Sequence, residues 1–280
     1  MTFSIVARAL NESGEPEWGV AVASKFLAVG NAVPAAVAGV GALATQADCN
    51  TAFKGLGLAL LDEGATAEVA LQRLLEDDEH PRDRQVGIVD SDGNCASHTG
   101  EDCFDWAGHR TGDGYAIQGN ILTGPEVLEA MKSAFLDTDG PLTRRLLRAL
   151  SAGDAAGGDR RGRQAAALFV VREGAGYGSH DDVACDLRVD DHTDPVAELA
   201  RLLDLNELYL VASTDDEKVP VDDALFTELE AHARAAGHEH FREWVGSQNY
   251  EMRVAPGLRP AWIDRRVLAI VRAQTGIMPT

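Results

Sequence analysis

The chain has 280 residues, of which 45% are hydrophobic and 25% charged, proportions typical of a globular protein. Its formal net charge is −20, so its long-range field repels nucleic acid and anionic membranes, and we expect neither as a partner. No stretch approaches the ~20 apolar residues of a membrane span. The N-terminus lacks the pattern of a secretory signal, so we expect a cytoplasmic protein.

The first part of the chain is predicted to form a β-hairpin followed by a third strand. Residues 2–8 and 18–24 are apolar runs, and the polar residues 11–16 between them favour a turn. Residues 39–46 are small and apolar, which suits a strand that is covered on both faces.

Helices and strands then follow in blocks. The expected segments are helices 50–62 and 66–76, strands 85–90, 94–99 and 115–118, helices from Pro125 and from Pro141, and strands 165–172 and 183–189. Because strands and helices do not alternate strictly, we predict an α+β fold with antiparallel sheets rather than a doubly wound parallel sheet. Two sheets packed face to face, with helix pairs outside, would bury all these segments.

The sequence pattern changes after Asp194. Apolar residues take helical spacing from Leu199 onward, and no strand pattern is evident beyond Val189. We therefore predict one domain over residues 1–195 and a small, mostly α-helical domain over residues 196–280.

The cysteines show no metal-binding spacing, because none of them forms a C-x₂-C pair. They are Cys49, Cys95, Cys103 and Cys185. In a cytoplasmic chain of this size we expect all of them to be reduced. The sequence leads us to expect no metal site and no cofactor.

Thr2 is the first candidate catalytic residue. Removal of Met1 before so small a residue would leave Thr2 with a free α-amine beside its own hydroxyl, which is a known nucleophile–base pair. An α-amine titrates near about 7.7–8.0, so it can accept the hydroxyl proton near neutral pH. The simpler alternative is that Thr2 only begins an edge strand.

Several motifs carry a resemblance to a known family. In the first domain they are TFSIVA at 2–7, GVAVASKFLAVG at 19–30, GVGALATQ at 39–46, RQVGIVDSDG at 84–93, WAGH at 106–109, QGN at 118–120, GGDRRGRQ at 157–164 and DLRVDDH at 186–192. With them, the chain resembles an uncharacterised domain family that is assigned to the N-terminal nucleophile (Ntn) hydrolase superfamily. The tail, with DLNELYL at 204–210, WVGSQNYEMR at 244–253 and IDRRVLAIVR at 263–272, resembles a peptidoglycan-binding-like domain.

This resemblance implies a four-layer αββα sandwich of antiparallel sheets. The N-terminal residue would lie at the end of the first strand, between the sheets, where the superfamily has a Thr, Ser or Cys nucleophile. Thr2 fits that position. The family's substrate is not established, so the resemblance implies a mechanism and no particular reaction.

Lys25 and Ser24 end the second predicted strand, which returns close to Thr2 in a hairpin. A cation beside Thr2 would lower the pKa of its hydroxyl and amine, and Ser24 would hydrogen-bond the amine. The alternatives are a solvated loop lysine and an ordinary strand-end residue.

Amide side chains follow two other predicted strands. Gln118 and Asn120 flank Gly119, and Asn120 is placed to complete an oxyanion hole, although asparagine is also an ordinary turn former. Thr45 and Gln46 leave the third strand and are assigned to the lining of a pocket, with helix capping as the alternative for this segment.

Asp159 and Arg163 lie in the glycine-rich loop 157–164. An arginine there would recognise a substrate carboxylate, and a structural ion-pair cluster is the alternative for this loop. The loop lacks the Gly-Lys-Ser/Thr ending of a P-loop.

These residues together lead us to expect an amidohydrolase that cleaves an amide or cyclic amide of a small molecule through an acyl-enzyme on Thr2. Thr2, Lys25 and Asn120 form the expected catalytic set, and Ser24, Thr45, Gln46, Gln118, Asp159 and Arg163 the substrate-binding set. The alternative is a non-catalytic scaffold that binds a partner through its helical C-terminal domain. We expect a homo-oligomer in either case.

Overall fold

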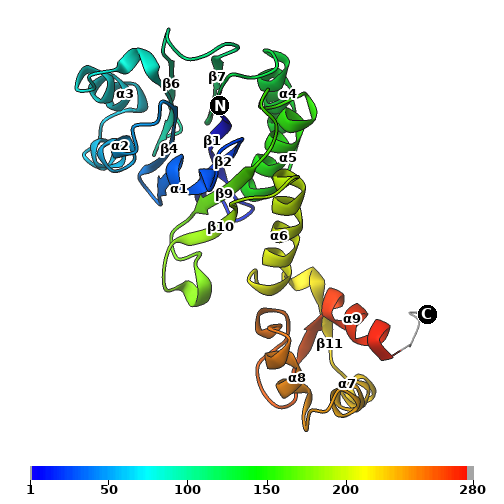
Figure 1. The fold of residues 1–280 in the computed structure, drawn as a ribbon. Coiled ribbons are helices and arrows are strands. Elements are labelled where there is room, and N and C mark those ends of the chain that lie inside the picture. The colour runs from blue at the N-terminus through cyan, green and yellow to red at the C-terminus, as the bar shows by residue number, and fades with distance from the viewer. Residues whose placement is uncertain (1, 276–280) are drawn as a thin grey trace. The chain divides into compact units, whose positions relative to one another are not determined.

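A computed structural model describes residues 2–275 of the chain (Figure 1). The chain divides into two compact units, one that ends at Leu203 and one that begins at Asp204. This boundary lies within helix α6 (Pro195–Tyr209). The predicted removal of Met1 concerns a residue outside the described range.

The first unit contains a six-stranded sheet with the order β10-β9-β2-β1-β8-β7, in which all neighbouring strands are antiparallel. Its strands are β1 (Thr2–Leu10), β2 (Pro16–Ser24), β7 (Gly108–Gly112), β8 (Tyr115–Asn120), β9 (Ala165–Val171) and β10 (Val183–Val189). The turn between β1 and β2 is held by Asn11, whose side-chain oxygen accepts from the backbone N–H groups of Ser13 and Glu15 at 2.9 Å. The predicted first hairpin is therefore present.

The second sheet of this unit is four-stranded and antiparallel, with the order β3-β4-β5-β6. Its strands are β3 (Pro34–Val37), β4 (Gly41–Ala47), β5 (Arg84–Asp90) and β6 (Cys95–Thr99). The Asp90 carboxylate closes the β5–β6 turn by accepting from the backbone N–H groups of Asp92 and Asn94. In the same turn Gly93 has a φ of 93°, which glycine adopts without strain.

Two pairs of helices pack against the sheets. They are α2 (Ala52–Asp62) and α3 (Ala67–Glu76), which contact the four-stranded sheet, and α4 (Glu126–Leu136) and α5 (Leu142–Ala155), which contact the six-stranded sheet. Figure 1 shows these pairs on opposite sides of the strands, with both sheets between them. Thr66 caps α3, the helix predicted at 66–76, by accepting from the Val69 N–H at 3.4 Å.

Three apolar clusters hold the first unit together. One lies beneath α4 and α5 and includes Phe3 and Ile5, and another lies beneath α2 and α3 and includes Leu43. The third is formed by residues of both sheets, among them Val6 and Ala44. Since successive side chains of a strand point to opposite faces, β1, β2, β4, β5 and β9 each contribute to two of these clusters.

The second unit has its own core and is largely helical. Its elements are β11 (Lys218–Pro220), α7 (Asp223–Ala235), α8 (Phe241–Ser247), β12 (Trp262–Asp264) and α9 (Arg265–Thr275), besides the end of α6. The core includes Phe241, Trp244 and Ile263, which are 2% exposed or less. Beside it, the buried Arg253 guanidinium donates to the Asp264 carboxylate at 2.9 Å. Burial would raise the pKa of Asp264, but hydrogen bonds from Ser213 and from the backbone, together with the nearby arginines, lower it.

The architecture is α+β with antiparallel sheets, as predicted. The expectation that no strand follows Val189 is wrong, since β11 and β12 form a short antiparallel pair. Three further elements, α1 (Val29–Ala32), β3 and β7, were not predicted from the sequence. The remaining short turns of 3₁₀ helix are Pro81–Asp83, Tyr177–Ser179, Asp215–Glu217 and Glu251–Arg253.

Within residues 2–275, no helix combines the length and the apolar character that crossing a membrane requires.

Candidate active site

Polar side chains are concentrated at one end of the space between the two sheets. On β1, Phe3 and Ile5 belong to the core beneath α4 and α5, so Thr2 and Ser4 point the other way, toward the four-stranded sheet. The residues that meet there are Thr2, Ser4, Ser24, Gln46, Gln85, Gln118 and Asn120, and we call them the polar cluster. All of them are at most 6% exposed.

Thr2 lies at the edge of this cluster, at the beginning of β1. Its Oγ1 shares a hydrogen bond of 3.1 Å with the Ser24 hydroxyl at the end of β2. Its backbone carbonyl accepts from Gln46 Nε2 at 3.3 Å, and Asn120 lies directly opposite it in the β1–β8 register. The structure therefore brings three other predicted site residues, Ser24, Gln46 and Asn120, around Thr2.

Gln85 of β5 connects the members of the polar cluster. Its Oε1 accepts from Asn120 Nδ2 at 2.9 Å and from Gln46 Nε2 at 2.8 Å. Its Nε2 donates to the Gly119 carbonyl at 2.7 Å, to the Gly108 carbonyl at 3.1 Å and to Thr99 Oγ1 at 2.9 Å. With both ends of its amide engaged and no exposure, Gln85 fixes the orientation of the Asn120 amide.

Gln118 fills the space above a glycine of the opposite sheet. It donates to Ser4 Oγ at 2.6 Å, and Ser4 donates to Gln46 Oε1 at 2.7 Å. A Cβ on Gly87 would lie 2.0 Å from Gln118 Oε1, so only glycine fits at this position of β5. The Gln118 Oε1 atom is buried and has no hydrogen-bond partner within the described part of the chain.

A histidine is connected to the cluster through Thr99. The Thr99 hydroxyl lies 2.9 Å from His109 Nδ1. Burial lowers the pKa of His109, and the nearby His98 and Arg110 lower it further, so the neutral imidazole is favoured. Because Gln85 donates to the Thr99 oxygen, the Thr99 hydroxyl can in turn donate to Nδ1 of His109 in the tautomer that carries its proton on Nε2.

Asp159 and Lys25 meet beside the cluster through the backbone. The buried Asp159 carboxylate accepts from the Lys25 N–H at 2.7 Å and from the Arg161 N–H at 2.8 Å. It thereby holds the chain directly after Ser24 against the glycine-rich loop. The side chain of Lys25 itself is exposed.

Thr45 and Arg163 are placed apart from the polar cluster. Thr45 follows Leu43 on the face of β4 that is covered by helices, and its hydroxyl donates to the Asn50 carbonyl at 3.2 Å. Arg163 pairs with Asp154 at 2.8 Å on the surface. Gln46, which follows Thr45 in the sequence, instead points into the space between the sheets.

Cysteine is a poor alternative nucleophile in this molecule. Within residues 2–275 none of the cysteines is joined in a disulfide. Burial raises the pKa of Cys49 and Cys103, and burial with nearby Asp90 and Asp113 raises that of Cys95 to about 12. Thiols of this kind are weakly ionised and unreactive. The described residues contain no group of three or more His, Cys, Asp or Glu side chains that would hold a metal ion.

Three residues of this site, Gln85, Ser4 and Thr99, were not among the residues predicted from the sequence. The sequence pattern that could have indicated them is a polar residue at every second position of an otherwise apolar strand. Thr2 and Ser4 show this pattern in one strand, and Gln118 and Asn120 show it in another. This alternation shows which face of a strand is polar, but it does not show which strands face each other.

Comparison with known proteins gives a family but no activity. The sequence model of a family described as "Family of unknown function (DUF1028)" matches residues 2–199. A crystal structure of protein SPO2555 from Silicibacter pomeroyi, which carries the same family model, is 30% identical with a TM-score of 0.66 and covers 76% of this chain and 90% of its own. No curated protein matches the sequence.

Two further solved structures show only a weak likeness. Anbu (ancestral beta-subunit) from Yersinia bercovieri is 11% identical with a TM-score of 0.31, covering 73% of this chain and 94% of its own. An Anbu (Gly-1) mutant from Hyphomicrobium sp. strain MC1 is 10% identical with a TM-score of 0.32 and the same coverage. These scores are too low to support a statement about this protein. The match over residues 2–199 is what assigns the chain: it belongs to the family DUF1028.

Proposed function

We propose that this protein is an N-terminal nucleophile amidohydrolase, built on a four-layer αββα sandwich, with Thr2 as its nucleophile. The observation that supports this most is the position of the Thr2 hydroxyl. It is buried at the very start of β1, hydrogen-bonded to Ser24 and bordered by Asn120. A strand that begins at residue 2 leaves the α-amine of a processed chain beside that hydroxyl.

The proposed reaction has two steps. Thr2 Oγ attacks the carbonyl carbon of an amide or cyclic amide, while the α-amine accepts the hydroxyl proton and delivers it to the leaving nitrogen. The C–N bond breaks and an ester forms on Thr2. Water, deprotonated by the same amine, then attacks the ester, and the released Thr2 oxygen takes back a proton.

Asn120 is the proposed oxyanion donor. One N–H of its Nδ2 donates to Gln85 Oε1, which fixes the plane of the amide, and the second N–H is assigned to the developing oxyanion. Ser24 orients the Thr2 hydroxyl through their shared hydrogen bond. Lys25 follows Ser24 directly, and its ammonium would favour the ionised hydroxyl and the neutral amine.

Hydrolysis by matched variants tests this proposal. Intact mass of the purified wild type should show the loss of one methionine residue. In a screen of small amides and cyclic amides, Thr2→Ala should lower turnover by about a thousandfold or more, with an unchanged circular dichroism spectrum. Thr2→Ser should retain part of the activity, because it keeps the hydroxyl.

Equal turnover by Thr2→Ala and the wild type would contradict the proposal. So would retention of Met1 in the active protein, because the amine base would then be absent. Retained Met1 with no turnover would favour the other function expected from the sequence, a non-catalytic binding scaffold.

A further inference from the structure

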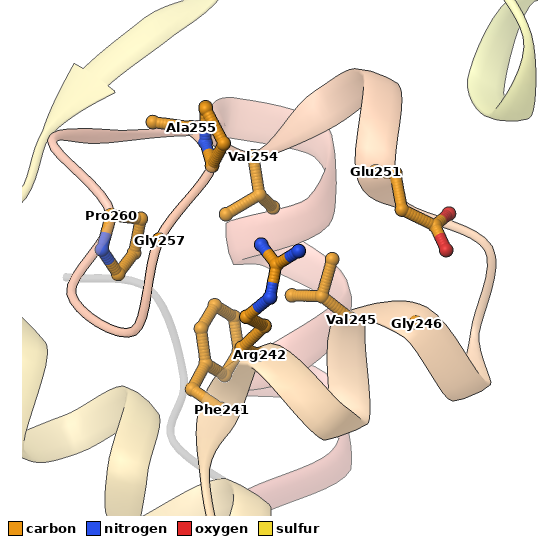
Figure 2. Close-up of a pocket in the computed structure, with 10 residues that line it drawn as sticks. Phe241, Arg242, Val245, Gly246, Glu251, Val254, Ala255, Gly257 and Pro260 are labelled. Carbon is orange, nitrogen blue, oxygen red and sulfur yellow. The ribbon is translucent and has the colours of Figure 1, made fainter.

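The second unit contains a cavity that the proposed hydrolase mechanism does not use. It has a volume of about 260 Å³, close to the lower end of the range of about 300–1,000 Å³ for small-molecule sites. Helix α8 forms one wall through Phe241 and Val245, and Val254 and Pro260 form the other (Figure 2). The cavity is lined mainly by apolar side chains.

The walls of this cavity belong to the core of the second unit. Phe241 is fully buried and stacks on Trp244 with ring centroids 5.3 Å apart. Val245 and Val254 are 6% and 5% exposed. Side chains packed in this way hold their positions, so the cavity is formed before any ligand arrives.

Arg242 is the cationic residue at this cavity, and it differs from the other arginines of the unit. Figure 2 shows its guanidinium among Phe241, Val245 and Val254, which line the same cavity. The other arginines pair with carboxylates: Arg234 with Glu230, Arg253 with Asp264, Arg259 with Asp223, Arg265 with Asp216, Arg266 with Glu217 and Arg272 with Glu228. Among the described residues Arg242 has no ion pair and no hydrogen-bond partner. In a protein with a net charge of −20, this leaves a cation available for a ligand.

We propose that this cavity binds a small apolar monocarboxylate, with the hydrocarbon part against Phe241 and Val254 and the carboxylate on Arg242. The apolar walls favour a hydrocarbon group, because its burial removes apolar surface from water. The planar guanidinium suits a carboxylate, which it can bind through two parallel hydrogen bonds. Glu251 also lines the cavity and would repel a second negative charge, so a ligand with one charge fits better than a polyanion.

The direct test is calorimetric titration of the full-length protein with N-acetyl-leucine. N-acetyl-leucinamide has the same shape without the charge, and acetate has the charge without the apolar group. A tripeptide that ends in leucine shows whether the carboxylate can also belong to a peptide terminus. We expect saturable binding of N-acetyl-leucine, and affinity for the neutral amide that is lower by about tenfold or more.

Two variants locate the binding to this cavity. Arg242→Gln should weaken binding of N-acetyl-leucine about tenfold or more, whereas Arg265→Gln, which removes the same charge from an exposed ion pair with Asp216, should not. Gly246→Leu should block the cavity. The nearest atom to a Cβ at Gly246 is Glu251 Oε1 at 3.7 Å, and leucine is a better helix former than glycine, so folding is preserved.

Gly55→Leu is the control for the blocking variant. Gly55 lies on α2 in the first unit, and a Cβ there meets no atom within 4 Å. This variant should bind N-acetyl-leucine as the wild type does. A dissociation constant weaker than about 10 mM, equal affinity for the amide, or undiminished binding by either Gly246→Leu or Arg242→Gln would overturn the proposal.

Discussion

The two ends of the space between the sheets are built from the same strands but with opposite chemistry. At one end Val6, Val20, Val22, Ala44 and Val89 form an apolar cluster. At the other end the same strands β1, β2, β4 and β5 contribute Thr2, Ser4, Ser24, Gln46 and Gln85. Both ends are buried, so exposure to water does not explain the difference.

The two ends therefore differ in how they are stabilised, by apolar packing at one end and by hydrogen bonds at the other. An apolar cluster stabilises a sheet interface by removing hydrocarbon from water, and it tolerates small changes in side-chain position. A buried polar cluster stabilises only if its groups are paired, and each pairing then fixes a side chain in one orientation. The polar end therefore has the rigidity that the roles proposed for Asn120 and Thr2 require, at the end of β1 where Thr2 lies.

The largest expected effect comes from removing the residue that connects the polar cluster. Gln85→Leu keeps the approximate volume but leaves Asn120 Nδ2, Gln46 Nε2 and the Gly119 carbonyl without this partner. We expect the free energy of unfolding in urea to fall by about 3–5 kcal/mol. Val20→Ala at the apolar end is the comparison, with an expected loss of about 2 kcal/mol. A smaller loss for Gln85→Leu than for Val20→Ala would break the contrast between the two ends.

A methyl group placed against the polar cluster should have the next largest effect. In Gly87→Ala the new Cβ would lie 2.0 Å from Gln118 Oε1, so Gln118 must leave its hydrogen bond with Ser4. We expect a loss of about 1–3 kcal/mol in the free energy of unfolding. Gly55 lies at an exposed position of α2, and a Cβ there meets no other atom within 4 Å. Gly55→Ala should therefore raise the free energy of unfolding by about 0.5–1 kcal/mol. Equal effects of the two substitutions would show that Gln118 is not held where the structure places it.

The smallest effect is a pH dependence at the edge of the polar cluster. Burial lowers the pKa of His109 below its usual 6.5, so the unfolded chain binds a proton in a pH range where the folded chain does not. The contribution of neutral His109 is fully present above pH 6.5 and is lost as the pH falls toward the folded-state pKa. Urea unfolding between neutral pH and pH 5 should show a weaker pH dependence for His109→Gln than for the wild type. An identical pH dependence of unfolding in both proteins would show that His109 does not cause this effect.

Most of the fold could be predicted from local sequence patterns. The first hairpin, the capped helix after Thr66 and strand Val183–Val189 are each specified by residues close in sequence. Strands β3 and β7 could not be found in this way. β3 begins at a proline, which is tolerated because β3 is an edge strand, and β7 is a half-exposed edge strand with few apolar residues.

The candidate site could be predicted only in part, for a related reason. Thr2 and Ser24 lie at the open end of the first hairpin, so their proximity was expected. The pairing of Thr2 with Asn120 joins strands that are far apart in the sequence, and no local pattern predicted it. Gln85 meets Gln46 and Asn120 across sequence separations of 39 and 35 residues, which depend on how the two sheets face each other. Thr45 was assigned to the site with Gln46, but adjacent strand residues point to opposite faces.

Covalent labelling by a β-lactone shows whether Thr2 is the nucleophile, because the site of labelling identifies the reactive side chain. This electrophile acylates an activated N-terminal hydroxyl, and acid quenching early in the reaction keeps the ester on Thr2 from being hydrolysed, so that mass spectrometry of the intact protein and its peptides locates it. Our account predicts one adduct on Thr2 of the processed chain, and none on Thr2→Ala. An adduct on a cysteine, or no adduct on a chain that has lost Met1, would contradict it.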